Sequence, residues 1–169
     1  MGRMSDFVHL RHKPATQLDR PRELIVACAP MRSNINISRI VRAAGCSGVS
    51  RILCCGTAKV IDRIARDGAE TVQVNVHRTL PHPLAELKRE GYRLVGLEQT
   101  SNSQSLFEYA FERRSVLVVG NERLGLEDDV LRLLDDVVEI PVYGQPHSHN
   151  VATATAMALY EYCRQFPSG

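Results

Sequence analysis

The sequence predicts an α/β fold, a mostly parallel β-sheet flanked by helices. Six short apolar runs recur along the chain, and helix-length segments separate most of them. Most runs are continuously apolar rather than alternating, as is typical of strands buried on both faces of a parallel sheet. Strands that alternate with helices favour an α/β architecture of this kind.

The apolar runs and the segments between them give the expected elements in order. The expected strands span residues 24–29, 51–55, 71–76, 92–97, 115–120 and 136–142. The expected helices span residues 34–45, 59–67, 81–90, 127–134 and 150–165. In the first helix, Arg39 and Arg42 fall about 60° apart on the polar side. Its apolar face is formed by Ile37, Ile40, Val41 and Ala44.

Size and composition indicate one globular domain. The chain has 169 residues, 44% of them hydrophobic and 24% charged, which is ordinary globular composition. We expect a domain over residues 23–166, preceded by a basic, loosely ordered stretch over residues 1–22. That stretch lacks the apolar core of a secretory signal, and no segment is apolar for the roughly 18 residues of a membrane span. We therefore expect a soluble cytoplasmic protein.

Cysteine and charge narrow the class of protein further. The five cysteines are odd in number and lack metal-ligand spacing, so we expect buried free thiols and no metal. The net charge of +2 is small, but 18 of the 21 basic residues are arginine. The arginine fork suits bidentate phosphate contacts. A GC-rich genome would produce the same bias.

Two common nucleotide-binding motifs are absent. The sequence after the first expected strand lacks the GxGxxG pattern of dinucleotide enzymes, and it has Ser33, Asn34 and Asn36 instead. The Walker lysine motif is also missing. These absences argue against dinucleotide and nucleoside triphosphate chemistry.

Three polar clusters instead follow three of the expected strands. They read SNINISRIVRAAG (33–45), VVGNERLGL (118–126) and IPVYGQPHSHN (140–150). Because ligands bind at the carboxyl edge of an open parallel sheet, each cluster is a candidate for the site. Asn36 is expected to cap the first helix, and Ser148 or Asn150 the last.

Together the clusters resemble the three motifs of the SpoU (TrmH-like) RNA 2'-O-methyltransferases, within the SPOUT superfamily. The resemblance runs in order from about Leu24 to Tyr162. The first motif offers Asn36 and Arg42. The second offers Gly120, Glu122 and Gly125, and the third offers Ile140, Pro141, Gly144, Ser148 and Asn150. One departure is His149, where the family has leucine.

The resemblance implies a fold and a reaction. It implies a C-terminal deep trefoil knot that binds S-adenosylmethionine, a homodimer whose site is completed across subunits, and RNA as the substrate. The reaction would transfer a methyl group to a ribose 2'-hydroxyl. We favour transfer RNA over ribosomal RNA because only about 23 residues precede the first strand.

The resemblance also implies roles for individual residues. Arg42 would act on the ribose hydroxyl, as a base or by stabilising an alkoxide while a phosphate oxygen or water takes the proton. Asn36 would position Arg42 or the ribose, Glu122 would anchor Arg42 or the substrate, and Ser148 and Asn150 would fix the substrate or the knot loop. The cofactor pocket would be lined by Leu97, Gly120, Ile140, Gly144, Ser148 and His149. The candidates for binding the RNA backbone are Arg11, Arg32 and Arg39.

Two other classes of protein stay open at this point. One is a catalytically silent RNA-binding relative, which a failure to bind S-adenosylmethionine would favour. The other is an unrelated α/β enzyme that uses His147 and His149 as acid, base or metal ligands. Bound metal, or activity lost only with the histidines, would favour that class.

Overall fold

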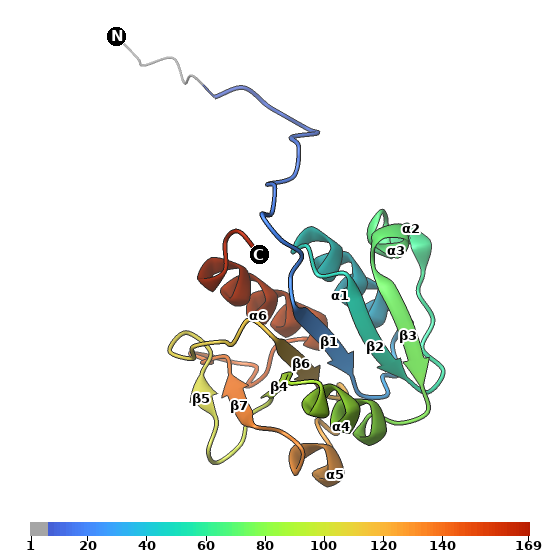
Figure 1. Ribbon diagram of the computed structural model, residues 1–169, viewed down its shortest axis with the longest axis vertical. Helices are drawn as coiled ribbons and strands as arrows, with labels where there is room; N and C mark the ends of the chain where they lie inside the picture. The colour runs from blue at the N-terminus through green and yellow to red at the C-terminus, as the bar shows by residue number, and fades with distance from the viewer. Residues whose placement is uncertain (1–6) are drawn as a thin grey trace.

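A single parallel sheet forms the centre of the protein (Figure 1). The computed structural model describes residues 7–169. The sheet order is β3-β2-β1-β6-β4-β7-β5, and every neighbouring pair is parallel. The strands are β1 (Leu24–Cys28), β2 (Arg51–Cys55), β3 (Gln73–His77), β4 (Arg93–Leu97), β5 (Gln104–Ser105), β6 (Ser115–Val119) and β7 (Asp136–Glu139). The predicted α/β architecture is therefore confirmed.

Helices cover both faces of the sheet. They are α1 (Asn34–Cys46), α2 (Asp62–Ala65), α3 (Gly68–Thr71), α4 (Pro81–Arg89), α5 (Asp128–Leu131) and α6 (Val151–Gln165). Helices α1 and α6 pack against each other on one face, with α2 and α3 beside α1. Helices α4 and α5 pack on the opposite face. The last helix thus returns to the side of the first.

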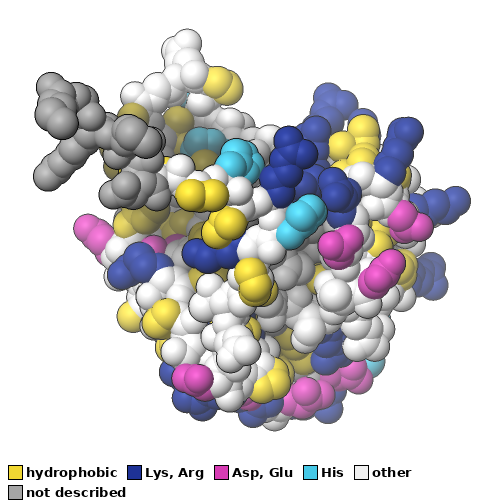
Figure 2. Space-filling model, turned by 90° about the horizontal axis from the view of Figure 1, so that it is seen from above, with side chains coloured by type: hydrophobic (Ala, Val, Ile, Leu, Met, Phe, Trp, Pro, Cys, Tyr) yellow, Lys and Arg dark blue, Asp and Glu magenta, His cyan; other side chains and the backbone are white. Residues whose placement is uncertain are grey.

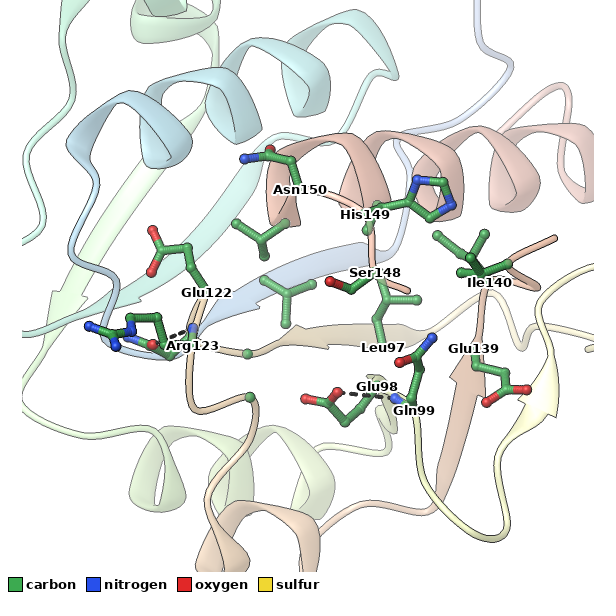
Figure 3. Close-up of a pocket in the computed structure, with 17 residues that line it drawn as sticks. Leu97, Glu98, Gln99, Glu122, Arg123, Glu139, Ile140, Ser148, His149 and Asn150 are labelled. Carbon is green, nitrogen blue, oxygen red and sulfur yellow. Dashed lines mark hydrogen bonds between the residues drawn. The ribbon is translucent and has the colours of Figure 1, made fainter. Parts of the chain in front are cut away.

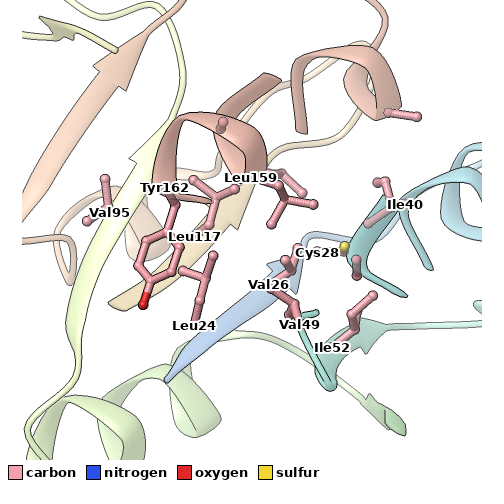
Figure 4. Close-up of a cluster of buried hydrophobic side chains, with 14 of the residues drawn as sticks. Leu24, Val26, Cys28, Ile40, Val49, Ile52, Val95, Leu117, Leu159 and Tyr162 are labelled. Carbon is pink, nitrogen blue, oxygen red and sulfur yellow. The ribbon is translucent and has the colours of Figure 1, made fainter. Parts of the chain in front are cut away.

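Alternate residues of each central strand enter two separate cores. In β1, Leu24, Val26 and Cys28 face α1 and α6, where Leu159 and Tyr162 also lie (Figure 4). The residues between them, Ile25 and Ala27, face the core built with α4 and α5. Burial on both faces explains why this run is continuously apolar in the sequence.

Two predicted helices are wrong in extent. The segment 59–67 does not form one helix, because Ile61 is extended and the chain reverses at Arg66, whose φ of 55° is left-handed. Gly68 then packs so closely on α1 that a Cβ atom would lie 3.0 Å from the carbonyl oxygen of Val41. The predicted helix 127–134 is confined to α5, the four residues from Asp128 to Leu131.

The strand predictions missed one element and overran another. The predicted strand 136–142 ends at Glu139, and Pro141 has no N–H to continue a ladder. Strand β5 has only two residues, too few for a periodic signal.

The prediction of buried free cysteines is confirmed for Cys28, Cys54 and Cys55. It is wrong for Cys46, which is exposed, and Cys163 is half-buried.

The segment before β1 contacts the domain through its last residues. Arg22 donates from Nε to the carbonyl oxygen of Ser47 at 2.7 Å and from Nη1 to that of Phe166 at 2.6 Å. The backbone N–H of Asp19 donates to the carbonyl oxygen of Ser168 at 2.9 Å. Residues 7–18 run away from the sheet in Figure 1. The expected looseness of residues 1–22 stays a prediction, and residues 1–6 lie outside the described residues.

Replacing Leu159 by alanine tests the α1–α6 core. Leu159 is fully buried in α6, so Leu159→Ala removes apolar contacts and leaves a cavity. We expect the free energy of unfolding to fall by about 2–5 kcal/mol in urea titrations. Phe107→Ala, at a side chain that is 57% exposed, serves as the control and should change it by less than about 1 kcal/mol. Equal losses in both variants would contradict this packing.

Candidate active site

A pocket of about 470 Å³ opens at the carboxyl edge of the sheet (Figure 3). Its walls are the residues that directly follow β4, β6 and β7, together with the first turn of α6. They are Leu97, Glu98, Gln99, Val119, Gly120, Asn121, Glu122, Arg123, Gly125, Glu139, Ile140, Val142, Ser148, His149, Asn150, Val151 and Ala154. The volume lies within the range of small-molecule sites.

Sheet order explains why these segments meet. Strand β4 lies between β6 and β7, so the three carboxyl ends are neighbours although they are far apart in the sequence. From β1 the chain adds β2 and then β3 on one side, and it then crosses to the other side of β1, where β4, β5, β6 and β7 lie. The strand order therefore reverses between β1 and β6, and α/β sheets bind ligands at such reversals. The second and third polar clusters therefore lie at one site, as predicted.

The first polar cluster reaches this site through the start of α1. The N-cap of α1 is Ser33, whose hydroxyl accepts the backbone N–H of Asn36 at 3.2 Å. The prediction that Asn36 caps this helix is therefore wrong. Asn36 lies in the first turn instead, and only 7% of it is exposed. Its amide is thus free to make contacts across the fold.

A chain of side-chain hydrogen bonds connects the three clusters. Nδ2 of Asn36 donates to Oε1 of Glu122 at 3.0 Å. Nδ2 of Asn150 donates to Oδ1 of Asn36 at 3.2 Å. Asn150 also caps α6, as expected, since its Oδ1 accepts the backbone N–H groups of Ala152 at 2.9 Å and Thr153 at 3.4 Å. Asn36 is therefore the link between the other two clusters.

Glu122 is held as a carboxylate by its donors. Besides Asn36, the backbone N–H groups of Arg32 and Ser33 donate to its two oxygens, each at 3.3 Å. Burial opposes the charged form, but the hydrogen bonds from Asn36 and from backbone N–H groups outweigh it, so the pKa of Glu122 lies below its ordinary value. Within this chain the partners of Glu122 are Asn36 and the start of α1, and the expectation that it anchors Arg42 or the substrate stays a prediction.

Arg42 is exposed on α1 and does not line the pocket of its own chain. Arg39 is exposed on the same polar side of this helix, as predicted. Arg32 is exposed just before α1, and Arg11 is exposed in the N-terminal segment. The four arginines are thus available to solvent, and none of them enters the pocket.

Five of the six predicted cofactor-binding residues line the pocket. They are Leu97, Gly120, Ile140, Ser148 and His149. Gly144 does not line it; it borders a second hollow formed mostly by the third motif, and no atom lies within 4 Å of a Cβ built on it. His147 is exposed, and its carbonyl oxygen accepts Nε2 of Gln99 at 3.2 Å. The described residues contain no cluster of side chains that could hold a metal ion.

Sequence reasoning missed Glu98 and Gln99, which stand in the pocket directly after β4. Their signal was present in the sequence, because they end the fourth apolar run as the other polar clusters end theirs. The short length of this cluster concealed it. Figure 3 shows Glu98 and Gln99 on the opposite side of the pocket from Asn150 and Glu122.

The chemistry of the walls fits a nucleoside that carries polar groups. Leu97, Val119, Ile140 and Val142 are apolar, as a purine ring requires. Carboxylate, amide and hydroxyl groups from Glu98, Asn150 and Ser148 surround them. A molecule with a flat apolar part and several hydrogen-bonding groups, such as S-adenosylmethionine, matches this mixture.

Within the described residues, no helix is long and apolar enough to span a membrane.

Known proteins are similar to this chain over most of its length. Residues 23–160 match the SpoU rRNA Methylase family. The tRNA (guanosine(18)-2'-O)-methyltransferase of Escherichia coli K12 is 30% identical over 149 residues. That match covers 86% of this chain and 65% of the relative, so the chain spans less than two thirds of that relative's length.

Solved structures share the fold. The TrmH/SpoU tRNA modifying enzyme of A. aeolicus superposes with a TM-score of 0.83 at 29% identity, covering 89% of this chain and 78% of that one. The SpoU methyltransferase AviRb of Streptomyces viridochromogenes, in complex with the cofactor AdoMet, gives a TM-score of 0.78 at 27% identity. It covers 92% of this chain and 67% of that one.

Replacing Glu122 by glutamine tests its hydrogen-bonded carboxylate. A group whose pKa is lowered by folding stabilises the protein above its unfolded pKa, and this contribution is lost as the pH falls through the folded pKa. We expect Glu122→Gln to be less stable than wild type near neutral pH, and the gap to close below about pH 4. Urea unfolding across this pH range measures it.

The control for this experiment is Glu108→Gln, at an exposed carboxylate outside the pocket. Its difference from wild type should stay small and change little with pH. A Glu122→Gln gap that is equally large at acid and neutral pH would show that the charge of Glu122 is not what its neighbours stabilise.

Proposed function

This chain belongs to the SpoU rRNA Methylase family, and we propose that it methylates the ribose 2'-hydroxyl of transfer RNA with S-adenosylmethionine as the donor. The observation that carries the proposal is the pocket at the carboxyl edge, where the second and third family motifs form walls and Asn36 of the first binds both. Functional support comes from the E. coli relative, which is named as a tRNA (guanosine(18)-2'-O)-methyltransferase.

We propose that the pocket holds the cofactor through the segments after β4, β6 and β7. The AdoMet complex of AviRb, which shares this fold, supports the assignment. Leu97 and Ile140 would contact the adenine, and backbone groups near Gly120, Ser148 and His149 would bind its polar atoms. When bound, the cofactor supplies a methyl group on a positively charged sulfur. The histidine at 149 fits this role if its backbone makes the contact.

The chain's own residues would align and activate the ribose hydroxyl. Asn36 and Asn150 are fixed to each other and to Glu122, so they present a rigid edge beside the pocket. Rigid positioning lowers the entropic cost of the attack. Glu122 is a poor proton acceptor because its pKa is lowered and its oxygens already accept three hydrogen bonds. Its role is therefore to hold Asn36 and the start of α1.

We propose that Arg42 acts across a homodimer. It is exposed and does not line the pocket of its own chain, so we propose that it acts on a methyl acceptor at a second copy's pocket. A guanidinium beside the hydroxyl would stabilise the developing alkoxide, while a phosphate oxygen or water takes the proton. The dimer expected from the family supplies this arrangement.

We further propose that the C-terminal segment is threaded as a trefoil knot within one domain over residues 23–166. Gln99 after β4 donates to the carbonyl oxygen of His147, which supports a close passage of the two loops. The chain also goes from α5 on one face, through β7, to α6 on the other.

We propose that the reaction takes place in the cytoplasm. The five cysteines are all unpaired, and the reducing cytoplasm keeps thiols in this state.

The RNA would lie across the exposed arginines. Figure 2 shows Lys and Arg side chains gathered on part of the face that carries the N-terminal segment. Arg32 and Arg39 border the start and the polar side of α1, and Arg11 lies in the preceding segment. Phosphate contacts of this kind give salt-dependent affinity. We propose that residues 1–22 take up a fixed position only on RNA.

Methyl transfer to RNA tests the proposal. Purified protein with radiolabelled S-adenosylmethionine should methylate unmodified transfer RNA, and mass spectrometry should place the methyl on a ribose 2'-oxygen. Guanosine 18, the position named in the E. coli relative, is the first to examine. We expect Arg42→Ala to lower the rate by about 100-fold or more while cofactor binding is retained.

The matched control is Arg89→Ala, which removes an exposed arginine from α4 on the opposite face. It should retain the wild-type rate. Methyl transfer to ribosomal RNA but not to transfer RNA would show that the substrate is ribosomal RNA and not transfer RNA. Cofactor binding without transfer to either RNA, or no cofactor binding at all, would favour a silent RNA-binding relative.

A further inference from the structure

We propose that Glu98 binds the ribose of the cofactor, with its carboxylate accepting the 2'- and 3'-hydroxyls. The inference rests on the proposed function, since it assumes that S-adenosylmethionine occupies the pocket. Glu98 is the first residue after β4, the strand between β6 and β7, and its side chain lines the pocket. Figure 3 shows it beside Gln99 at the edge of the cavity.

Two backbone donors fix the carboxylate of Glu98 without exhausting it. The N–H of Leu126 donates to Oε2 at 3.1 Å, and the N–H of Gln99 donates to Oε1 at 3.0 Å. A carboxylate oxygen has two lone-pair positions, so each oxygen of Glu98 can accept one hydroxyl besides its backbone donor. The geometry therefore offers two acceptors side by side, as a vicinal diol requires.

The loop after β6 leaves room for this carboxylate. Gly125 has a φ of 67°, and a Cβ atom on it would collide with the carboxylate of Glu98. Gly120 is also required, because its Cβ would lie 2.6 Å from the carbonyl carbon of Gly125. Any larger residue at either position would push the loop or Glu98 out of place. Both glycines of the second motif thus serve the position of Glu98.

The neighbours of Glu98 favour ribose over the charged tail of the cofactor. Leu97 precedes it, and Val119 and Ile140 line the same pocket, which together give an apolar place for adenine. The sugar is the part of the molecule attached directly to the base. In dinucleotide-binding α/β folds, an acidic residue likewise accepts a hydrogen bond from the ribose 2'-hydroxyl.

Calorimetric titration of the whole protein tests the assignment. The probes are S-adenosylmethionine, S-adenosylhomocysteine and the 2',3'-dideoxy form of S-adenosylhomocysteine. Because hydrogen bonds to a charged acceptor are strong, Glu98→Gln should weaken the first two ligands by a similar factor of about 10 to 100. Wild type should bind the dideoxy form about as weakly as Glu98→Gln binds S-adenosylhomocysteine. Glu98→Gln should bind the dideoxy form little more weakly than wild type does.

Glu127→Gln is the matched control, because Glu127 is an exposed carboxylate close in sequence to Leu126 that does not line the pocket. It should bind all three ligands as wild type does. Two outcomes overturn the ribose assignment while leaving the proposed function intact. One is that Glu98→Gln weakens S-adenosylmethionine but not S-adenosylhomocysteine, which would mean that Glu98 attracts the positive sulfur.

The second outcome that overturns the ribose assignment is that wild type binds 2',3'-dideoxy-S-adenosylhomocysteine as tightly as S-adenosylhomocysteine. This arm needs no variant, so it is decisive even if Glu98→Gln fails to fold. If wild type binds neither natural ligand, the proposed function fails, and the ribose assignment fails with it. The melting temperature of each variant without ligand shows whether a loss of binding is local.

Discussion

The hydrogen bonds of Asn36 are the interaction on which the site depends. This side chain donates to Glu122 after β6 and accepts from Asn150 at the start of α6, so one amide joins three segments that are distant in the sequence. Asn36 is nearly fully buried, and losing either bond would leave a buried polar group unpaired. The position of α6 is therefore coupled to the edge of the pocket.

The parallel sheet provides the frame for this network. Strands buried on both faces cannot slide without exposing apolar side chains, so the ends of β4, β6 and β7 are held at fixed positions. Close packing then requires small residues where loops approach each other, as Gly120 does against Gly125. Fixed strand ends and tightly packed loops together shape the walls of the pocket.

Local rules predicted much of this arrangement, and the failures have physical reasons. Continuous apolar runs located six strands, and polar residues before an apolar helix pointed to Ser148 or Asn150 as its cap, of which Asn150 is the cap. Asn36 has the same chemistry, but Ser33 takes the cap, and only tertiary contacts show that Asn36 pairs with Glu122. The break at Arg66 depends on packing of α3 against α1, and the role of Glu98 depends on which strand lies beside β4.

The most direct test of the account is hydrogen exchange of the protein with and without S-adenosylmethionine, followed by mass spectrometry of peptides. Our account predicts that the cofactor slows exchange together in residues 97–99, 119–126 and 139–151, which form the pocket. Peptides from α4, on the other side of the sheet, should change little. Protection of only one of these segments, or protection elsewhere in the chain, would contradict a single site built from the three strand ends.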